Sequence, residues 1–120
     1  MKTEICILEK NFENIYEDFI TTNSNALIYH SLTYKKFLYN SILNTIHKYI
    51  VAVNGKRILA VVPCIIKLSE KGNILNSLPF FGSHGSILGA ENLKELEIKK
   101  IFLKLNELID SYNIKSVTIV

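Results

Sequence analysis

The sequence is poor in the residues that mark several functional classes. Its 120 residues include two cysteines and no tryptophan, and Arg57 is the only arginine among 14 basic residues. Cys6 and Cys64 lack the clustered spacing of a disulfide framework or a zinc site, so both are expected to be buried apolar residues. The three histidines and two cysteines never fall at ligand spacing, so no metal is expected.

Long apolar runs and concentrated charge are also lacking. The longest apolar run, Ile58 to Ile66, has nine residues, whereas a membrane-spanning helix needs about 20. The N-terminal apolar stretch ends at Glu9 after four residues, too few for a signal peptide. The net charge of +3 comes mostly from scattered lysines and forms no basic patch for nucleic acid. We therefore expect a cytoplasmic protein without a membrane span or nucleic-acid recognition.

The apolar content suffices for one packed domain over residues 1–120. Hydrophobic residues make up 48% of the chain and charged residues 21%, which is typical of a globular domain. The β-prone segment Lys115 to Val120 ends the chain without a polar run-out. We therefore expect a domain that is incomplete at its C-terminus, as a fragment of a longer protein with two halves would be.

Apolar periodicity predicts the element order β, α, α, β, β, β, α, β, which is an α+β domain with a mixed, mostly antiparallel sheet flanked by helices. Asn11 is expected to cap the first helix, and the second helix is expected to bury residues from Tyr34 to Thr45, including Phe37. The predicted elements are strand 4–9, helix 12–20, helix 34–45, strands 49–53, 57–67 and 74–78, helix 91–112 and strand 115–120.

Four local signals sharpen this prediction. Asn54 and Gly55 favour a type I′ hairpin turn between the first two strands of the meander. Pro63 cannot donate to a strand ladder, so a bulge or a break in pairing is expected within the long strand. Asn113 is expected to close the last helix in a left-handed conformation. The strand after it is then expected to lie parallel to the strand that begins at Ile74.

Three local motifs follow one another between Ala26 and Gly89: Tyr29-His30-Ser31 with Tyr34, Val61-Val62-Pro63, and Ser77-Leu78-Pro79-Phe80 followed by Gly82 and Gly85. The predicted element order resembles the GNAT acyltransferase fold, and these motifs resemble its FemAB-like branch. That branch has a histidine at a helix entry, a strand with a Leu-Pro-like step, and a Ser-Leu-Pro-Phe segment before a glycine-bearing loop. Two departures stand out: Tyr34 replaces a more usual tryptophan, and the loop lacks paired glycines.

The resemblance implies the N-terminal GNAT-like half of an N-acyltransferase or aminoacyltransferase that positions an amine acceptor. The acceptor would be a small molecule or a cell-envelope precursor. The donor, acyl-CoA or an aminoacyl group, would be bound in the full-length protein, whose second half usually supplies the donor site. In such enzymes catalysis is mainly positioning, together with a base for the attacking amine. The 120-residue chain would then lack the donor site.

His84 is the candidate catalytic residue, because it lies in a glycine-flanked loop where side chains are exposed. The alternative is that His84 only bonds a backbone carbonyl and shapes the turn. His30 matches the helix-entry histidine of the family, although such a residue also caps the backbone, and His47 requires no special account. The candidate substrate-binding residues are Phe80, Phe81, Gly82, Ser83, His84, Gly85, Ser86, His30 and Tyr34.

The loop from Gly82 to Ser86 occupies the place at which GNAT enzymes bind the pyrophosphate of acyl-coenzyme A. Glycines there let backbone N–H groups approach a phosphate, and the helix that follows adds positive charge. The preceding aromatic residues and Glu91 at the helix start oppose this role, which favours substrate positioning or plain structure. Two alternatives stay open: a non-catalytic binding or homodimerising module, and a small stand-alone acetyltransferase that binds coenzyme A.

Overall fold

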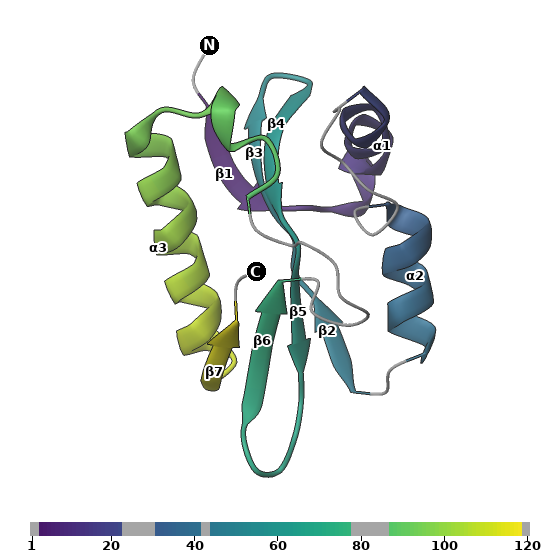
Figure 1. The fold of residues 1–120 in the computed structure, drawn as a ribbon, viewed down its shortest axis with the longest axis vertical. Helices are drawn as coiled ribbons and strands as arrows, with labels where there is room; N and C mark the ends of the chain where they lie inside the picture. The colour runs from purple at the N-terminus through teal and green to yellow at the C-terminus, as the bar shows by residue number, and fades with distance from the viewer. Residues whose placement is uncertain (1–2, 23–30, 42–43, 78–86, 119–120) are drawn as a thin grey trace.

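The computed structural model describes residues 3–22, 31–41, 44–77 and 87–118 (Figure 1). Figure 1 shows α3 on one side of the strands and α1 and α2 on the other. This is the predicted α+β class, with one additional short strand. The elements are β1 (Glu4–Ile7), the 3-10 helix η1 (Lys10–Phe12), α1 (Glu13–Thr22), α2 (Leu32–Ser41), β2 (Thr45–His47), β3 (Ile50–Asn54), β4 (Arg57–Val62), β5 (Cys64–Lys67), β6 (Asn73–Ser77), the 3-10 helix η3 (Ala90–Asn92), α3 (Glu95–Ser111) and β7 (Ile114–Thr118).

Pro63 divides the long strand of the meander, as expected, and the sheet divides with it. β4 ends at Val62 in a sheet of order β1-β3-β4, and β5 begins at Cys64 in a sheet of order β2-β5-β6-β7. The neighbouring strands change sheet in the same way, because β2 pairs with β5 and β3 pairs with β4. Between β2 and β3, the N–H of Lys48 donates to the carbonyl of Cys64 at 2.9 Å. A proline tolerates this position because the ladder is interrupted there. The predicted parallel pairing of the last strand is confirmed, since β7 runs parallel to β6.

The predicted hairpin turn is wrong by one residue. Asn54 pairs with Arg57 inside the ladder, so that the loop consists of Gly55 and Lys56, and Gly55 has a φ of 64°. A glycine at the first loop position is the requirement of a type II′ turn rather than a type I′ turn. The ladder also shifts register between Ala52 and Val53, close to this turn.

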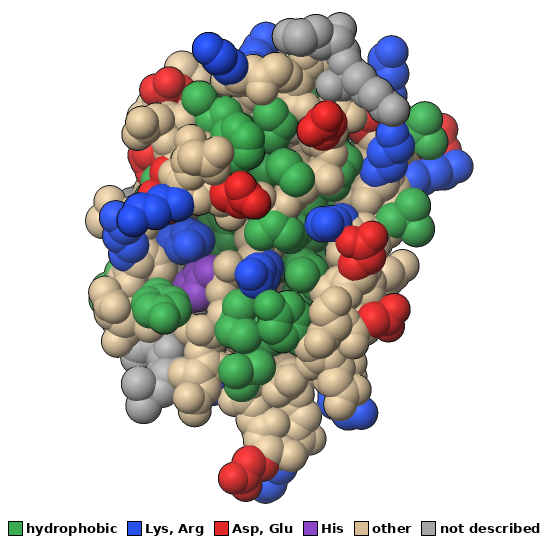
Figure 2. All heavy atoms as spheres, turned by 180° about the vertical axis from the view of Figure 1, so that it is seen from behind, with side chains coloured by type: hydrophobic (Ala, Val, Ile, Leu, Met, Phe, Trp, Pro, Cys, Tyr) green, Lys and Arg blue, Asp and Glu red, His purple; other side chains and the backbone are tan. Residues whose placement is uncertain are grey.

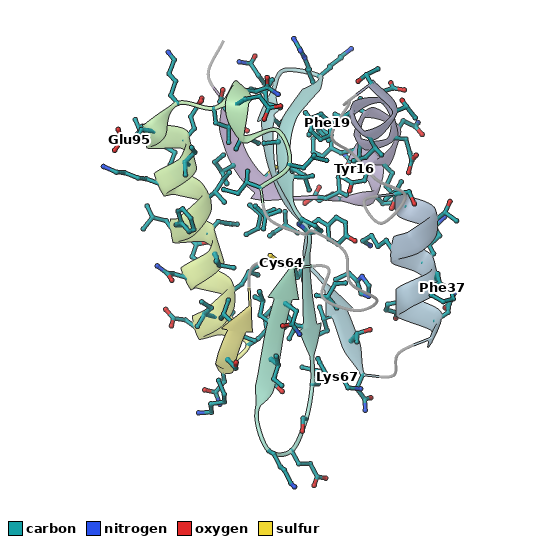
Figure 3. The ribbon with its side chains drawn as sticks, viewed as in Figure 1. Tyr16, Phe19, Phe37, Cys64, Lys67 and Glu95 are labelled. Atoms are coloured by element: carbon teal, nitrogen blue, oxygen red, sulfur yellow. The ribbon has the colours of Figure 1, made fainter. Side chains whose placement is uncertain are left out.

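The second helix ends earlier than its apolar periodicity predicts. α2 stops at Ser41, and Asn44 takes a left-handed φ of 59° that turns the chain into β2. Thr45 is therefore a buried strand residue and not the end of a helix. Phe37 is 51% exposed and lies on the outer side of α2 (Figure 3), so the prediction that it is buried is wrong.

The ends of the other two helices also differ from prediction. Asn11 lies inside η1 and does not cap α1. The predicted helix start at Glu91 falls in η3, after which Leu93 is extended and α3 begins at Glu95. At the far end Asn113 has the predicted left-handed φ, of 50°, and its N–H donates to the Asp110 carbonyl in the last turn of α3.

Two hydrophobic cores lie on opposite faces of the strands. Tyr16 and Phe19 of α1 pack on one face, and Ile101 and Leu105 of α3 pack on the other (Figure 3). Cys64 is buried in the α3 core and Cys6 is half-buried, and both are free thiols. Burial raises the pKa of the Cys64 thiol to about 12, so it behaves as an apolar group, as expected.

Candidate functional site

The site residues predicted from sequence fall almost entirely outside the described part of the chain. Only Tyr34 lies within it, in α2, and its side chain is not described. The roles assigned to these residues therefore stay predictions. The residues outside the described ranges are His30, Phe80, Phe81, Gly82, Ser83, His84, Gly85 and Ser86.

The structure places strand pairing after the glycine-bearing loop, where the sequence predicted none. Leu88 and Val61 form an antiparallel bridge, with N–H to carbonyl distances of 2.9 Å in both directions. The chain thus leaves one sheet after Ser77 and joins the other at Leu88. The segment that leads directly into α3 is therefore Gly89 to Lys94, and not the loop from Gly82 to Ser86.

The N-terminal end of α3 does not fit the pyrophosphate of an acyl-coenzyme A. Glu91 lies in η3, and Glu95 and Glu97 lie in the first turn of α3. The N–H of Lys94 donates to the Glu97 carboxylate at 2.8 Å, and this bond holds the pKa of Glu97 below its usual value. The N–H groups of Glu97 and Ile98 donate to the Lys94 carbonyl. The positive end of the helix is thus already compensated by carboxylates, which repel a phosphate.

His47 of β2 lies among aromatic rings in what we call the histidine–tyrosine cluster, formed by Tyr39, His47 and Tyr49. The His47 ring stacks on Tyr49 with centroids 6.5 Å apart and meets the edge of Tyr39 at 5.7 Å. Lys35 Nζ lies 5.6 Å from the centroid of the Tyr49 ring. His47 Nε2 lies 3.4 Å from Thr45 Oγ1. The cluster joins α2 to the strands through polar and aromatic contacts.

The cluster keeps His47 neutral at physiological pH. Burial, with a further contribution from the charge of Lys35, lowers the pKa of His47 to about 4. Burial likewise lowers the pKa of Lys35. The Nδ1 atom of His47 is buried and has no hydrogen-bond partner among the described residues. When Nε2–H points to Thr45 Oγ1, Nδ1 keeps a lone pair that can accept an N–H donor.

His47 belongs to a row of side chains that crosses three strands. The register pairs His47 with Ile65 and Ile65 with Asn76. Directly paired residues point to the same face, and Ile65 belongs to the core on the α1 side. Adjacent strands are about 4.8 Å apart, so the row spans about 10 Å. Figure 2 shows basic side chains gathered over part of this face of the molecule.

Sequence reasoning missed this cluster because it extended the second helix as far as Thr45. The signal was present in the alternation of Thr45, His47 and Tyr49, which is the period of a strand. Asn44 is a residue type that tolerates the left-handed conformation, and it would have marked the start of this strand. The partners Lys35 and Tyr39 come from a different element, and no sequence pattern indicates that contact.

Acidification is expected to destabilise the protein through His47. The pKa of His47 is about 4 in the folded chain and about 6.5 in an unfolded chain. Between these pH values the unfolded chain binds more protons, so the free energy of unfolding falls as the pH falls. The contribution of His47 is complete above about pH 6.5 and is lost by about pH 4. Urea unfolding at pH 7 and pH 5 measures this loss.

The control for this prediction is His47→Asn, which does not titrate in this range. The unfolding midpoint of the variant should fall less between pH 7 and pH 5 than that of the unaltered protein. An NMR titration of the His47 ring gives the pKa directly. A ring that titrates near pH 6.5 would contradict the burial of His47.

Comparisons with known proteins identify the fold. No family model matches the sequence, and no curated protein does. A GNAT family acetyltransferase of Staphylococcus aureus has a similar structure, with a TM-score of 0.59 and 10% identity over 100% of this chain and 87% of that chain. A possible acetyltransferase from Clostridium difficile has a TM-score of 0.56 and 17% identity, over 100% and 80% of the two chains.

A transcriptional regulator from Bacillus halodurans is also similar, with a TM-score of 0.56 and 10% identity over 99% of this chain and 81% of that chain. The chain thus has the fold of GNAT acetyltransferases. Identities this low show the fold and leave the activity to be argued from the site. Among the described residues, no helix is long and apolar enough to cross a membrane, and no group of His, Cys, Asp or Glu could hold a metal ion.

Proposed function

We propose that this chain is the N-terminal GNAT-like part of a FemAB-like N-acyltransferase and that it positions the amine acceptor. The observation that carries the proposal is the neutral His47, whose buried Nδ1 has no hydrogen-bond partner among the described residues. A buried hydrogen-bond acceptor without a partner costs free energy. An N–H group of the amine substrate could donate a hydrogen bond to Nδ1 and remove this cost. Asn76, in the same cross-strand row, adds a second polar group on that face.

In the proposed reaction the acceptor nitrogen bonds to the acyl carbonyl carbon, and the bond from that carbon to the leaving group of the donor breaks. The amine proton leaves with the leaving group or passes to solvent. A histidine with a pKa of about 4 is too weak a base to remove this proton at neutral pH. We therefore assign His47 a positioning role, in which it accepts a hydrogen bond and orients the nucleophile.

The donor site of the proposed enzyme would lie outside the described part of the chain. The carboxylates of Glu91, Glu95 and Glu97 disfavour a phosphate group at the start of α3. When bound, acyl-CoA or an aminoacyl donor would supply the activated carbonyl. This arrangement agrees with a protein of two halves, in which the second half holds the donor.

Acceptor binding tests the proposal directly. Glucosamine, as a primary-amine probe, should shift the amide NMR signals of His47, Ile65 and Asn76 in a saturable way. His47→Leu removes the acceptor atom and should weaken binding about tenfold, which corresponds to one hydrogen bond of about 1.4 kcal/mol. His47→Asn keeps a hydrogen-bond acceptor near the position of Nδ1 and should retain most of the affinity.

Two results would contradict the acceptor role of His47. The first is the absence of amide shifts with glucosamine and with a lysine-containing tripeptide at tens of millimolar. The second is equal affinity in the His47→Leu and His47→Asn proteins. Lys71→Gln, in the turn between β5 and β6, changes one charge far from the cluster and serves as the control.

Binding of coenzyme A to the 120-residue chain would distinguish a stand-alone acetyltransferase from the function proposed here. Coenzyme A should not shift the amide signals of Glu95 to Ile98, because carboxylates already compensate that helix end. Saturable shifts at these residues would show that the chain binds its own donor. In that case the 120-residue protein should also transfer an acetyl group to a primary amine.

The non-catalytic alternative rests on the edge of the sheet. Within the described residues, β7 is hydrogen-bonded to β6 alone, and Val117 on β7 is 38% exposed. An open strand edge can pair with a second copy of the chain. Light scattering that reports twice the mass of 13.7 kDa, together with no amine binding, would favour this module over the transferase.

A further inference from the structure

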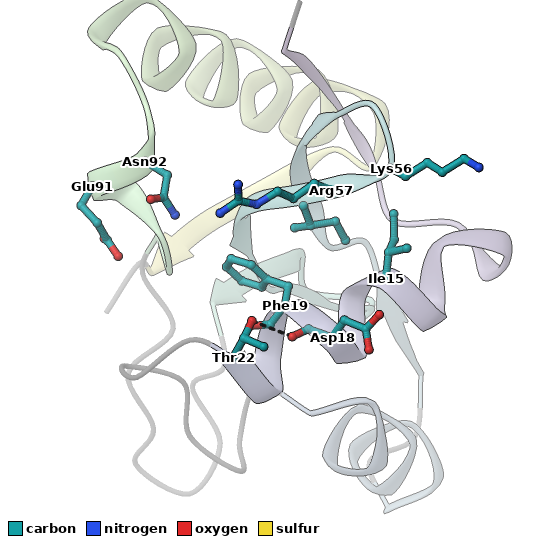
Figure 4. A pocket seen from close by; sticks show the side chains of 9 residues that line it. Ile15, Asp18, Phe19, Thr22, Lys56, Arg57, Glu91 and Asn92 are labelled. Carbon is teal, nitrogen blue, oxygen red and sulfur yellow. Dashed lines mark hydrogen bonds between the residues drawn. The ribbon is translucent and has the colours of Figure 1, made fainter. Parts of the chain in front are cut away.

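A pocket lies between α1, the β3–β4 hairpin and η3 (Figure 4). It encloses about 460 Å³, which is within the size range of small-molecule sites. Its walls combine an apolar part with charges of both signs. The residues that matter are Ile15, Phe19 and Ile58 for the apolar part, and Asp18, Arg57 and Glu91 for the charges.

Close backbone packing holds the three walls of this pocket together. A Cβ atom on Gly89 would lie 2.3 Å from the Leu59 carbonyl oxygen and 3.1 Å from the Phe19 ring, so only glycine allows this approach. Asn92 Nδ2 donates to the same Leu59 carbonyl at 2.9 Å. These contacts fix η3 against β4 and beside α1. The position of Glu91 across the pocket from α1 therefore follows from the fold.

The charges around the pocket are separate from one another. Arg57 comes from β4, Asp18 from α1 and Glu91 from η3. Among the described residues, none of these three takes part in an ion pair, because every nitrogen-to-oxygen distance exceeds 4.0 Å. Figure 4 shows the Arg57 side chain directed toward η3 above the Phe19 ring. The space between the charges is thus available to a ligand.

We propose that this pocket binds a small zwitterion, namely a free α-amino acid with an apolar side chain. The planar guanidinium of Arg57 suits a carboxylate, to which it can donate two parallel hydrogen bonds. The carboxylates of Asp18 and Glu91 suit the ammonium group. The apolar side chain of the ligand packs on Phe19 and Ile58, which are buried. This inference does not depend on the acyltransferase proposal.

Because the pocket is lined by charges of both signs, it favours a zwitterion over an ion with a single charge. An anion alone would face Asp18 and Glu91, and a cation alone would face Arg57, so each would meet repulsion. A zwitterion places one charge against each sign. Blocking either end of the ligand should therefore reduce its affinity.

The test uses L-leucine as the probe, with N-acetyl-L-leucine and L-leucinamide as singly charged analogues. L-leucine should produce saturable amide NMR shifts at Asp18, Arg57 and Asn92, and each analogue should bind at least tenfold more weakly. Equal binding of N-acetyl-L-leucine would overturn the proposal, because it would show a simple anion site. The absence of saturable shifts with L-leucine at tens of millimolar would also overturn it.

A matched pair of substitutions locates the effect. Arg57→Gln removes the proposed carboxylate ligand and should weaken L-leucine binding about tenfold or more. Lys56→Gln removes the neighbouring cation, whose side chain runs away from the others in Figure 4, and should leave binding unchanged. Both residues are exposed, so both variants should keep the unfolding midpoint of the unaltered protein. An equal loss of binding in both would overturn the role of Arg57.

Discussion

Replacing Gly89 by alanine is expected to lower the free energy of unfolding by about 3 kcal/mol or more. Two effects add at this position. Gly89 has a φ of 88°, which an L side chain adopts only with strain, and the new Cβ would meet the Leu59 carbonyl oxygen at 2.3 Å. The backbone of β4 cannot yield easily because Val61 and Leu88 are joined by two backbone hydrogen bonds, one in each direction. Urea unfolding of the two proteins measures the loss.

Gly72→Ala is the control, because Gly72 also has a positive φ, of 134°. There the added methyl group meets Lys115 Cγ at 2.7 Å, and the exposed Lys115 side chain can move aside. The expected cost is about 1 kcal/mol, mainly from backbone strain. Equal losses in the two variants would show that φ alone matters at Gly89 and that the contact with β4 does not.

Leu75→Ala is expected to lower the free energy of unfolding by about 3 kcal/mol. Leu75 is fully buried in the core between the strands and α3. Truncation leaves a cavity there because the surrounding side chains collapse only in part. Chemical unfolding followed by circular dichroism measures the effect. The loss should also loosen β6, which carries Asn76 of the proposed acceptor face.

The neighbouring residue provides the control for this prediction. Ile74 lies on the same strand, points to the opposite face and is 39% exposed, so Ile74→Ala should cost less than about 1 kcal/mol. The two substitutions remove similar side chains from adjacent positions. If Ile74→Ala proved as destabilising as Leu75→Ala, the assignment of Leu75 to the core would be wrong.

Much of the fold could be predicted because its signals are local. Pro63 lacks an N–H group whatever surrounds it, so a break in the strand was predictable. Asn113 tolerates a left-handed conformation, and the apolar periodicity after Glu95 is that of a helix against a sheet. The parallel last strand followed from the preference of strand, helix, strand units for one crossover. Each of these inferences needed only residues near one another in the sequence.

The failures arise where distant segments decide the outcome. The hairpin turn differs by one residue because Asn54 pairs with Arg57 inside the ladder, and turn composition does not report which residues of two strands pair. α2 ended early because Thr45 gains a pairing partner in Lys67 of β5. The helical periodicity at Thr45 is overridden by this strand pairing, and the ends of helices are the parts whose position is least fixed by local sequence.

The candidate sites also divide into those that local sequence indicates and those that depend on contacts between distant segments. His84 and the aromatic residues around it were chosen for their glycine-rich context, and they lie outside the described residues. His47 was given no role, because the sequence does not indicate the burial that lowers its pKa to about 4. The pocket between α1, the β3–β4 hairpin and η3 likewise depends on Asp18, Arg57 and Glu91. These residues are far apart in the sequence and line the same pocket only in the folded chain.

The sequence by itself determined the α+β class, the order of most elements, the break at Pro63 and the left-handed conformation of Asn113, because composition and short-range chemistry control these features. Only the tertiary structure decided that the sheet divides in two, that His47 is neutral and that opposite charges line one pocket. Burial and the distance between charges set pKa values and ligand chemistry. Both quantities exist only once the chain is packed.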